Sequence, residues 1–419
     1  MSERDARRAI DAVWRIESAR LIAALARMTG DVGVAEDLAQ DALLAALEQW
    51  PEAGVPENPG AWLMATAKNR AIDRLRRNEM AARREEELGR EVELRSRLAE
   101  LDPAEAASDE IDDDLLGLIF TACHPVLAPE ARVALTLRLV GSLSTAEIAR
   151  AFLAKESTVA QRIVRAKRSL AEARVPIEVP GPDERERRLA PVLEVIYAIF
   201  NEGYAASAGE EWIRADLCEE AMRLGRVLAG LMPREPEVLG LAALMELTAA
   251  RFPARTGPAG EAIPLPEQDR SRWDFVLIGR GLRGLERAEA LGRPLGPYAL
   301  QAAIAACHAR ARTPEQTDWE RIVALYDALD AISGSPVVRL NRAVAVGMAF
   351  GPAAGLELLD GLGEEPALRG YHLLPAARGE LLERLGRSEE AALEFSRAAE
   401  LSGNAREREV LLARAGGRH

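Results

Sequence analysis

Three arginines recur at every third position in one short segment, as Arg162, Arg165 and Arg168. A guanidinium group can pair with two acceptors at once, which suits phosphate oxygens and the major-groove edge of guanine. In the same segment, Gln161 suits an adenine edge and Val164 can contact a thymine methyl group. These side chains on one helix face would predict a surface that binds the major groove of DNA.

The elements that must position this surface have the pattern of a helix-turn-helix. Ser144 and Glu147 have the spacing of a capping box, which fixes the start of a helix that ends near Phe152. A turn over 153–155 separates it from a second helix over 157–170. An ordinary amphipathic hairpin shares some of these features, but the capping box, the short turn and the basic arc together favour DNA binding.

The second helix has two distinct faces when its residues are placed about 100° apart. The apolar stripe that we expect to face the core comprises Val159, Ile163, Ala166 and Leu170. The opposite arc comprises Ser157, Thr158, Gln161, Val164, Arg165 and Arg168, with Arg162 at its edge.

A second helix with nucleic-acid chemistry is predicted over 61–77. Its apolar stripe comprises Leu63, Met64, Ala67, Ala71 and Leu75. Its polar face comprises Trp62, Thr66, Asn69, Asp73 and Arg77, flanked by Arg70 and Arg76. An aromatic ring among basic and amide side chains favours stacking on unpaired bases, although a tryptophan lying over the protein surface fits the pattern equally well.

A third segment, over 35–47, is acidic and amphipathic. Its acidic face suits docking on a basic partner helix, or simple exposure to water.

Composition and charge limit the class of protein. Aromatic residues make up only 4% of the 419 residues and Leu and Ala dominate, so helices packed on helices are favoured over sheets. A net charge of −13 excludes a general nucleic-acid coat, yet basic side chains concentrate in 61–84 and 150–174, on both sides of an acidic stretch over 100–114.

The cysteines and the hydropathy pattern point to a reduced compartment. Cys123, Cys218 and Cys307 are far apart and no C-x-x-C pair occurs, so we expect neither a disulfide framework nor a metal site, and Cys123 is predicted to be buried. No apolar run reaches the roughly 20 residues of a membrane span. We expect a cytoplasmic protein with no membrane contact and no cofactor.

The chain is predicted to be all-α with four parts. These are a helical domain over 5–78, a charged linker over 79–110, a helix-turn-helix domain over 111–175 and a helical tail over 183–419. Near the end of the tail, small and large residues fall at the spacings of a tetratricopeptide (TPR) repeat: Gly379, Leu382, Ala391, Phe395 and Ala398. We therefore predict a TPR-like α-solenoid for the tail.

In combination, these motifs resemble the extracytoplasmic-function (ECF) sigma factors of RNA polymerase over about residues 8–174. The run Gly30-Asp31 to Asp41 resembles sigma region 2.2, which binds the polymerase. The run Pro59 to Arg77 resembles regions 2.3 and 2.4, which melt and bind the −10 element. The run Ser144 to Leu170 resembles region 4.2, which binds the −35 element.

The resemblance implies roles for individual residues and names core RNA polymerase and promoter DNA as partners. The polymerase contacts it implies are Asp37, Leu38, Gln40, Asp41 and Leu44. The −10 contacts are Asn69, Arg70, Asp73 and Arg76, to which the polar face adds Trp62 and Arg77. The −35 contacts are Ala160, Gln161, Arg162, Val164 and Arg165, although Ala160 departs from the basic residue often found there.

The tail resembles the TPR-like extension, of the DUF6596 type, found in one ECF subgroup. The segments that carry this resemblance are 193–207, 214–218, 269–273 and 300–308. Members of that subgroup are typically encoded beside DGPF proteins and lack an obvious anti-sigma partner. The resemblance therefore implies regulation through the tail, by a protein or a ligand.

Two other classes of function are open on the residues alone. A stand-alone helix-turn-helix regulator with a sensing tail would need no polymerase. An enzyme in the tail would use titratable groups in Asn201-Glu202-Gly203-Tyr204, Arg214, Asp216 and His308, but these include no nucleophile–base pair and no metal spacing. We therefore expect no catalytic residues.

Overall fold

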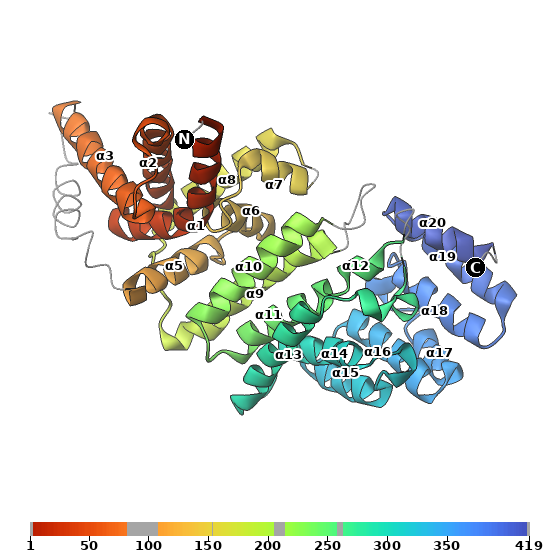
Figure 1. Ribbon diagram of the computed structural model, residues 1–419. Helices are drawn as coiled ribbons and strands as arrows, with labels where there is room; N and C mark the ends of the chain where they lie inside the picture. The colour runs from red at the N-terminus through yellow and green to blue at the C-terminus, as the bar shows by residue number, and fades with distance from the viewer. Residues whose placement is uncertain (1–2, 82–107, 153, 205–213, 258–262, 417–419) are drawn as a thin grey trace. The chain divides into compact units, whose positions relative to one another are not determined.

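The computed structural model describes residues 3–81, 108–152, 154–204, 214–257 and 263–416 (Figure 1). Its elements are helices, with no β-strand in those ranges, so the all-α prediction is confirmed. The chain divides into two compact units, Met1–Ala198 and Ile199–His419.

Three helices begin the first unit: α1 (Glu3–Thr29), α2 (Val32–Ala53) and α3 (Pro59–Ala81). The turn between α1 and α2 is stabilised by residues within the turn itself. Gly30 has a φ of +68°, which glycine adopts without strain, and the Asp31 carboxylate then accepts hydrogen bonds from the backbone N–H groups of Gly33 and Val34 at 2.6 and 3.0 Å. This N-cap starts α2 at the predicted turn.

Four further helices of the first unit are α5 (Ser108–Ala122), α6 (Pro129–Leu139), α7 (Thr145–Ala151) and α8 (Glu156–Glu172). Helix α5 packs on α1, and α6 contacts both α7 and α8. Of the predicted linker over 79–110, α3 takes the first residues and α5 the last, while 82–107 lie outside the described residues.

Helix α9 (Pro182–Tyr204) begins in the first unit and ends in the second. Its first half is tied to α5, because the Arg188 guanidinium donates to the carbonyl of Phe120 at 3.2 Å. The connecting segment before α9 also packs closely, since a Cβ on Gly117 would stand 3.2 Å from the backbone of Glu178. The division between the units therefore falls within α9, later in the chain than residue 183, where the tail is predicted to begin.

The second unit continues with paired helices. They are α10 (Ala215–Leu231), α11 (Pro236–Ala249), α12 (Phe252–Arg255), α13 (Phe275–Ala290), α14 (Pro297–Arg310), α15 (Trp319–Ser333), α16 (Pro336–Phe350), α17 (Pro352–Asp360), α18 (Leu373–Arg384), α19 (Ser388–Leu401) and α20 (Ala405–Ala415). From α13 to α20, each helix contacts the next. Short 3-10 turns lie between some of them, including η2 (Arg270–Arg272).

The TPR-like spacing near the end of the tail corresponds to the α18–α19 hairpin. Leu382, Ala391, Phe395 and Ala398 belong to one buried cluster. A Cβ on Gly379 would stand 2.8 Å from the Phe395 ring, so the glycine is what lets this ring fill the space between the two helices. The pairing predicted from the spacing is therefore present in this hairpin, and the solenoid as a whole stays a prediction.

The three cysteines are buried and unpaired. Burial raises the pKa of the Cys123 thiol to about 11 and that of Cys218 to about 12. In the described parts of the chain, no group of three His, Cys, Asp or Glu side chains is arranged to hold a metal ion. Among the same residues, no helix has the length and hydropathy needed to cross a membrane.

Candidate nucleic-acid and polymerase interface

The predicted helix-turn-helix is formed by α7 and α8, and the capping box at its start is complete. The Ser144 backbone N–H donates to the Glu147 carboxylate at 2.7 Å, and the Glu147 backbone N–H donates to the Ser144 hydroxyl at 3.1 Å. Partial burial works to raise the pKa of Glu147, but the hydrogen bonds with Ser144 outweigh it and leave that pKa below its ordinary value. Helix α7 is therefore fixed at its first turn.

Replacing Ser144 with alanine should destabilise this first turn by about 1 kcal/mol, because the Glu147 N–H loses its acceptor. Amide hydrogen exchange in α7 should become faster by the factor that corresponds to this loss of free energy, while the amides of α1 and α2 keep their protection. Ser169→Ala is the control, since Ser169 lies inside α8 and caps no helix. Equal exchange in both variants would contradict the role of the cap.

Helix α8 has the two faces that the sequence predicts. Val159, Ile163, Ala166 and Leu170 are all buried, which confirms the apolar stripe. The opposite arc is open: Ser157, Thr158, Gln161, Val164, Arg165 and Arg168 are exposed, while Arg162 and Ala160 are half-buried. Val164 is 64% exposed although it is apolar, which suits contact with a partner and not with this unit's own core.

Arg168 of this arc has one weak contact within its own helix. Arg168 forms an exposed ion pair with Glu172 at 3.0 Å, one helical turn away. Such a pair contributes only a few tenths of a kcal/mol, so it leaves Arg168 available to a phosphate.

On α3, the side chains of Trp62, Asn69 and Arg70 are described, and those of Asp73, Arg76 and Arg77 lie outside the described ones. The Trp62 ring is half-buried and meets the buried Trp50 ring edge to face, with centroids 5.2 Å apart. Asn69 is exposed, and Arg70 lies 3.7 Å from the Asp41 carboxylate. Trp62 thus packs partly on its own unit, a geometry that leaves only part of the ring for a base.

On α2, the five predicted polymerase contacts differ in how far their side chains are exposed. Leu44 is 53% exposed and Asp37 is also exposed, whereas Gln40 and Asp41 are half-buried. Leu38 is only 1% exposed, so its side chain belongs to the core beneath this face. Leu47, three residues later on α2, and Ile16 on α1 are also exposed apolar side chains.

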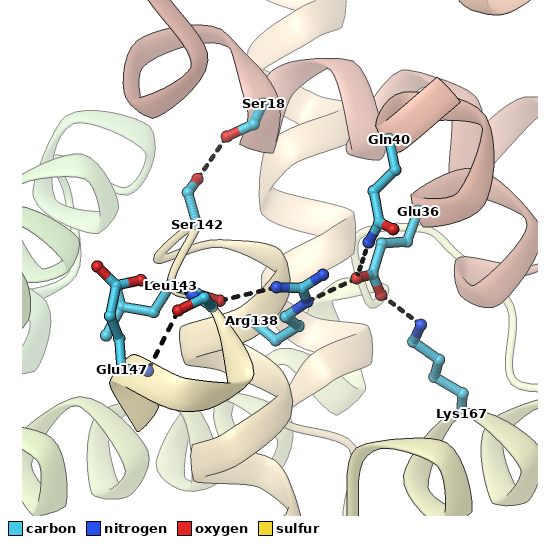
Figure 2. A network of polar contacts seen from close by, with 9 residues as sticks. Ser18, Glu36, Gln40, Arg138, Ser142, Leu143, Glu147 and Lys167 are labelled. Atoms are coloured by element: carbon cyan, nitrogen blue, oxygen red, sulfur yellow. Dashed lines mark hydrogen bonds and ion pairs between the residues drawn. The ribbon is translucent and has the colours of Figure 1, made fainter. Parts of the chain in front are cut away.

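A buried ion cluster that the sequence analysis missed joins α2 to α6 and α8. The Glu36 side chain is 5% exposed and accepts hydrogen bonds from Arg138 Nε at 2.6 Å and from Gln40 Nε2 at 2.7 Å. Lys167 Nζ forms an ion pair with the other Glu36 oxygen. Figure 2 shows Glu36 between the Arg138 and Lys167 side chains, which come from different helices.

Two further contacts join α1 to other parts of the same unit. Arg27 on α1 pairs with Asp114 on α5 at 2.7 Å. The buried Ser18 hydroxyl on α1 shares a hydrogen bond with the hydroxyl of Ser142, whose backbone has a left-handed φ of 58°. The helix-turn-helix therefore packs on α1 and α2 within one unit.

One sequence signal pointed to Glu36. It lies four residues after Val32 and three before Ala39, both buried, so it falls on the apolar stripe of α2. A charged residue on such a stripe requires an internal partner, although the sequence does not identify which one.

Comparison with protein families gives three matches along the chain. A model described as sigma-70 region 2 matches residues 15–80, and one described as sigma-70, region 4 matches 118–170. A family of unknown function, DUF6596, matches 188–289. The first two matches cover α2, α3 and the helix-turn-helix, and the third covers the start of the second unit.

Comparison with curated proteins gives relatives of two kinds. "Uncharacterized protein R00370" of Rhizobium meliloti is 45% identical over 390 residues, which cover 92% of this chain and 90% of the relative. "Probable ECF RNA polymerase sigma factor SigI" of Mycobacterium tuberculosis is 27% identical over 177 residues, covering 42% of this chain and 59% of the relative.

Proposed function

Because this chain belongs to the extracytoplasmic-function sigma factors that carry a DUF6596 extension, we propose that α2, α3 and α8 bind core polymerase and the two promoter elements. As a sigma factor, it binds core RNA polymerase and directs promoter-specific transcription initiation. The proposal concerns which side chains do so, and what the second unit contributes.

The polymerase-binding surface in this proposal is the outer face of α2. Asp37, Asp41 and Gln40 supply polar and acidic groups, and Leu44 supplies an exposed apolar contact. An acidic rim around an apolar centre suits a basic or polar helical partner. Leu38 supports this face from beneath, through the core.

The −10 element is assigned to the polar face of α3. Asn69 and Arg70 would contact the strand, Trp62 would stack through the part of its ring that is not packed on Trp50, and Asp73, Arg76 and Arg77 continue the same helix. Unstacking a base costs a few kcal/mol, so this contact forms only when the polymerase holds the promoter.

The −35 element is assigned to α8, and the exposed basic arc opposite its buried stripe is the observation that carries the proposal. Arg162, Arg165 and Arg168 would contact phosphates or guanine edges. Ser157, Thr158, Ala160, Gln161 and Val164 complete the surface.

The second unit is proposed to regulate these surfaces by binding a protein or a ligand, and to perform no bond chemistry. Such a protein would work in the cytoplasm, where the polymerase is. A net charge of −13 supports promoter binding that depends on polymerase, because a free acidic chain is repelled by DNA at long range.

Reconstitution with core polymerase tests the proposal. The full chain, mixed with core enzyme and fragments of its own genome, should produce discrete run-off transcripts that core enzyme alone does not make. A stand-alone regulator would instead bind a DNA fragment without polymerase and start no transcript. That second outcome would replace the proposal with the rival class.

A further inference from the structure

Three arginines of the second unit lie close together, around the end of α9 and the short helix α12. The Arg255 guanidinium lies 3.6 Å from the centre of the Tyr204 ring, and that of Arg251 lies 5.8 Å from it. Arg251 is also close enough to Arg255, Arg270 and His308 to act on each of them electrostatically. Three segments far apart in the sequence thus place cationic and imidazole groups together, and Tyr204 lies against two of the arginines.

Two of these arginines have a structural explanation. Arg255 donates to the carbonyl of Tyr204, in the last turn of α9. Arg270 donates to the carbonyls of His308 and Ala311 at 2.9 and 2.7 Å, at the end of α14, and to the Thr317 hydroxyl at 3.2 Å. Both therefore satisfy carbonyls that a helix end leaves without partners.

Arg251 has no such explanation. Its guanidinium donates to the Tyr204 hydroxyl at 2.9 Å and caps no helix. Within the described ranges, neither Arg251 nor Arg270 forms an ion pair with a carboxylate. Arg251 is half-buried, so a solute can reach it. The Glu315 carboxylate offsets part of the charge of Arg270 electrostatically, which leaves Arg251 as the arginine with neither a helix-end role nor an ion pair among the described residues.

The same neighbourhood has an excess of hydrogen-bond donors. Buried nitrogens of three residues have no hydrogen-bond partner among the described residues: Arg270 Nε, Trp273 Nε1 and His308 Nδ1. The Arg270 guanidinium lies 5.0 Å from the Trp273 ring, and the His308 ring meets the Trp319 ring edge to face at 5.2 Å. Arg270 Nε and Trp273 Nε1 can only donate, so the group they lack is an acceptor, and the His308 ring presents Nδ1 as a donor in one of its two neutral tautomers.

We propose that this cluster, Arg251, Arg255, Arg270, Trp273 and His308, binds an oxyanion, the phosphate or carboxylate group of a small molecule, with Arg251 as its main ligand. An oxyanion would supply a negative charge beside Arg251 and an acceptor for the buried donors, and guanidinium groups bind oxyanions with paired hydrogen bonds. This site does not depend on the assignment of promoter contacts, because it lies wholly in the second unit.

His308 provides a reporter inside the cluster. Desolvation, reinforced by the positive charges of Arg251 and Arg270, lowers its pKa to about 4. A bound anion favours the imidazolium form, so saturating oxyanion should raise the pKa of His308. A purely structural role for the arginines would leave that pKa where it is.

The test uses the full chain and two probes, inorganic phosphate and citrate, each titrated at constant ionic strength with sodium chloride as the balance. The His308 pKa is followed by NMR and assigned with His308→Asn, and the thermal midpoint of the second unit is followed in parallel. Both should rise saturably with at least one probe, and the responding probe identifies the oxyanion class. Arg251→Gln should weaken binding about tenfold or more, since it removes a charged donor pair.

Arg234→Gln is the matched control, because Arg234 is an exposed arginine of the same unit outside the cluster. It should bind like the unaltered chain. Equal titrations for Arg251→Gln and the unaltered chain would overturn the proposal, as would a response that never saturates. If Arg251→Gln fails to fold, the unaltered chain decides alone: a His308 pKa unmoved by both probes rejects the site.

Discussion

Replacing Arg165 with alanine should lower transcription from a −35-dependent promoter roughly five- to 150-fold, while binding to core polymerase is unchanged. The magnitude corresponds to about 1–3 kcal/mol for a lost arginine contact to a base edge. Arg165 is exposed at the centre of the α8 arc, so its loss removes no packing from the core. The measurement is run-off transcription with a fixed amount of holoenzyme.

Arg187→Ala is the control, because Arg187 is equally exposed but lies on α9, away from the arc. Base and phosphate contacts can be distinguished with altered −35 sequences. A base contact relaxes discrimination at one position, whereas a phosphate contact weakens all sequences alike and reduces the salt dependence. Loss of polymerase binding in parallel with transcription would contradict the assignment of α8 to DNA.

Replacing Glu36 with glutamine should destabilise the packing of α6 and α8 on α2 by about 2–3 kcal/mol. The glutamine keeps the shape of the side chain, but it leaves Arg138 and Lys167 without their counter-charge. Breaking a fully buried pair costs about 3–5 kcal/mol. Both cations keep some exposure, 24% and 21%, so water offsets part of that cost. Hydrogen exchange in α6 and α8 should accelerate accordingly.

Glu172→Gln is the matched comparison, since Glu172 pairs with Arg168 on the exposed face of α8 and is 67% exposed. That change should cost less than about 0.5 kcal/mol. A double variant of Glu36→Gln with Lys167→Gln should be less destabilised than the sum of the two single variants, because one of the two unpaired cations is then absent. If the destabilisation of the double variant equals the sum of the two single effects, Glu36 and Lys167 do not interact energetically.

Local chemistry made much of α7 and α8 predictable. Ser144 and Glu147 fixed one helix start within four residues of sequence, and the spacing from Val159 to Leu170 identified which side chains of α8 are buried. The turn at Gly30 and Asp31 was readable for the same reason. Each of these features is decided by interactions within one or two helical turns.

What the sequence could not supply is the pairing of distant groups. Glu36 and Arg138 are separated by 102 positions, and nothing local in either segment identifies the other. The same limit applies to Arg270 in the tail, which donates hydrogen bonds to carbonyl groups 38 and 41 positions later in the sequence. Leu38 illustrates a different limit: in a run where acidic residues alternate with leucines and alanines, the core side of the helix is decided by what packs on it.

The three buried cysteine thiols can report local unfolding of the protein without an added label. An alkylating reagent reacts with thiolate, and a pKa near 11 leaves about one Cys123 in ten thousand ionised at neutral pH. Cys123 belongs to the first unit, and Cys218 and Cys307 to the second. The rate at which each site is modified therefore tracks how often its own surroundings loosen, with no engineered label, and it can distinguish a signal that acts on one half of the molecule from a signal that acts on both.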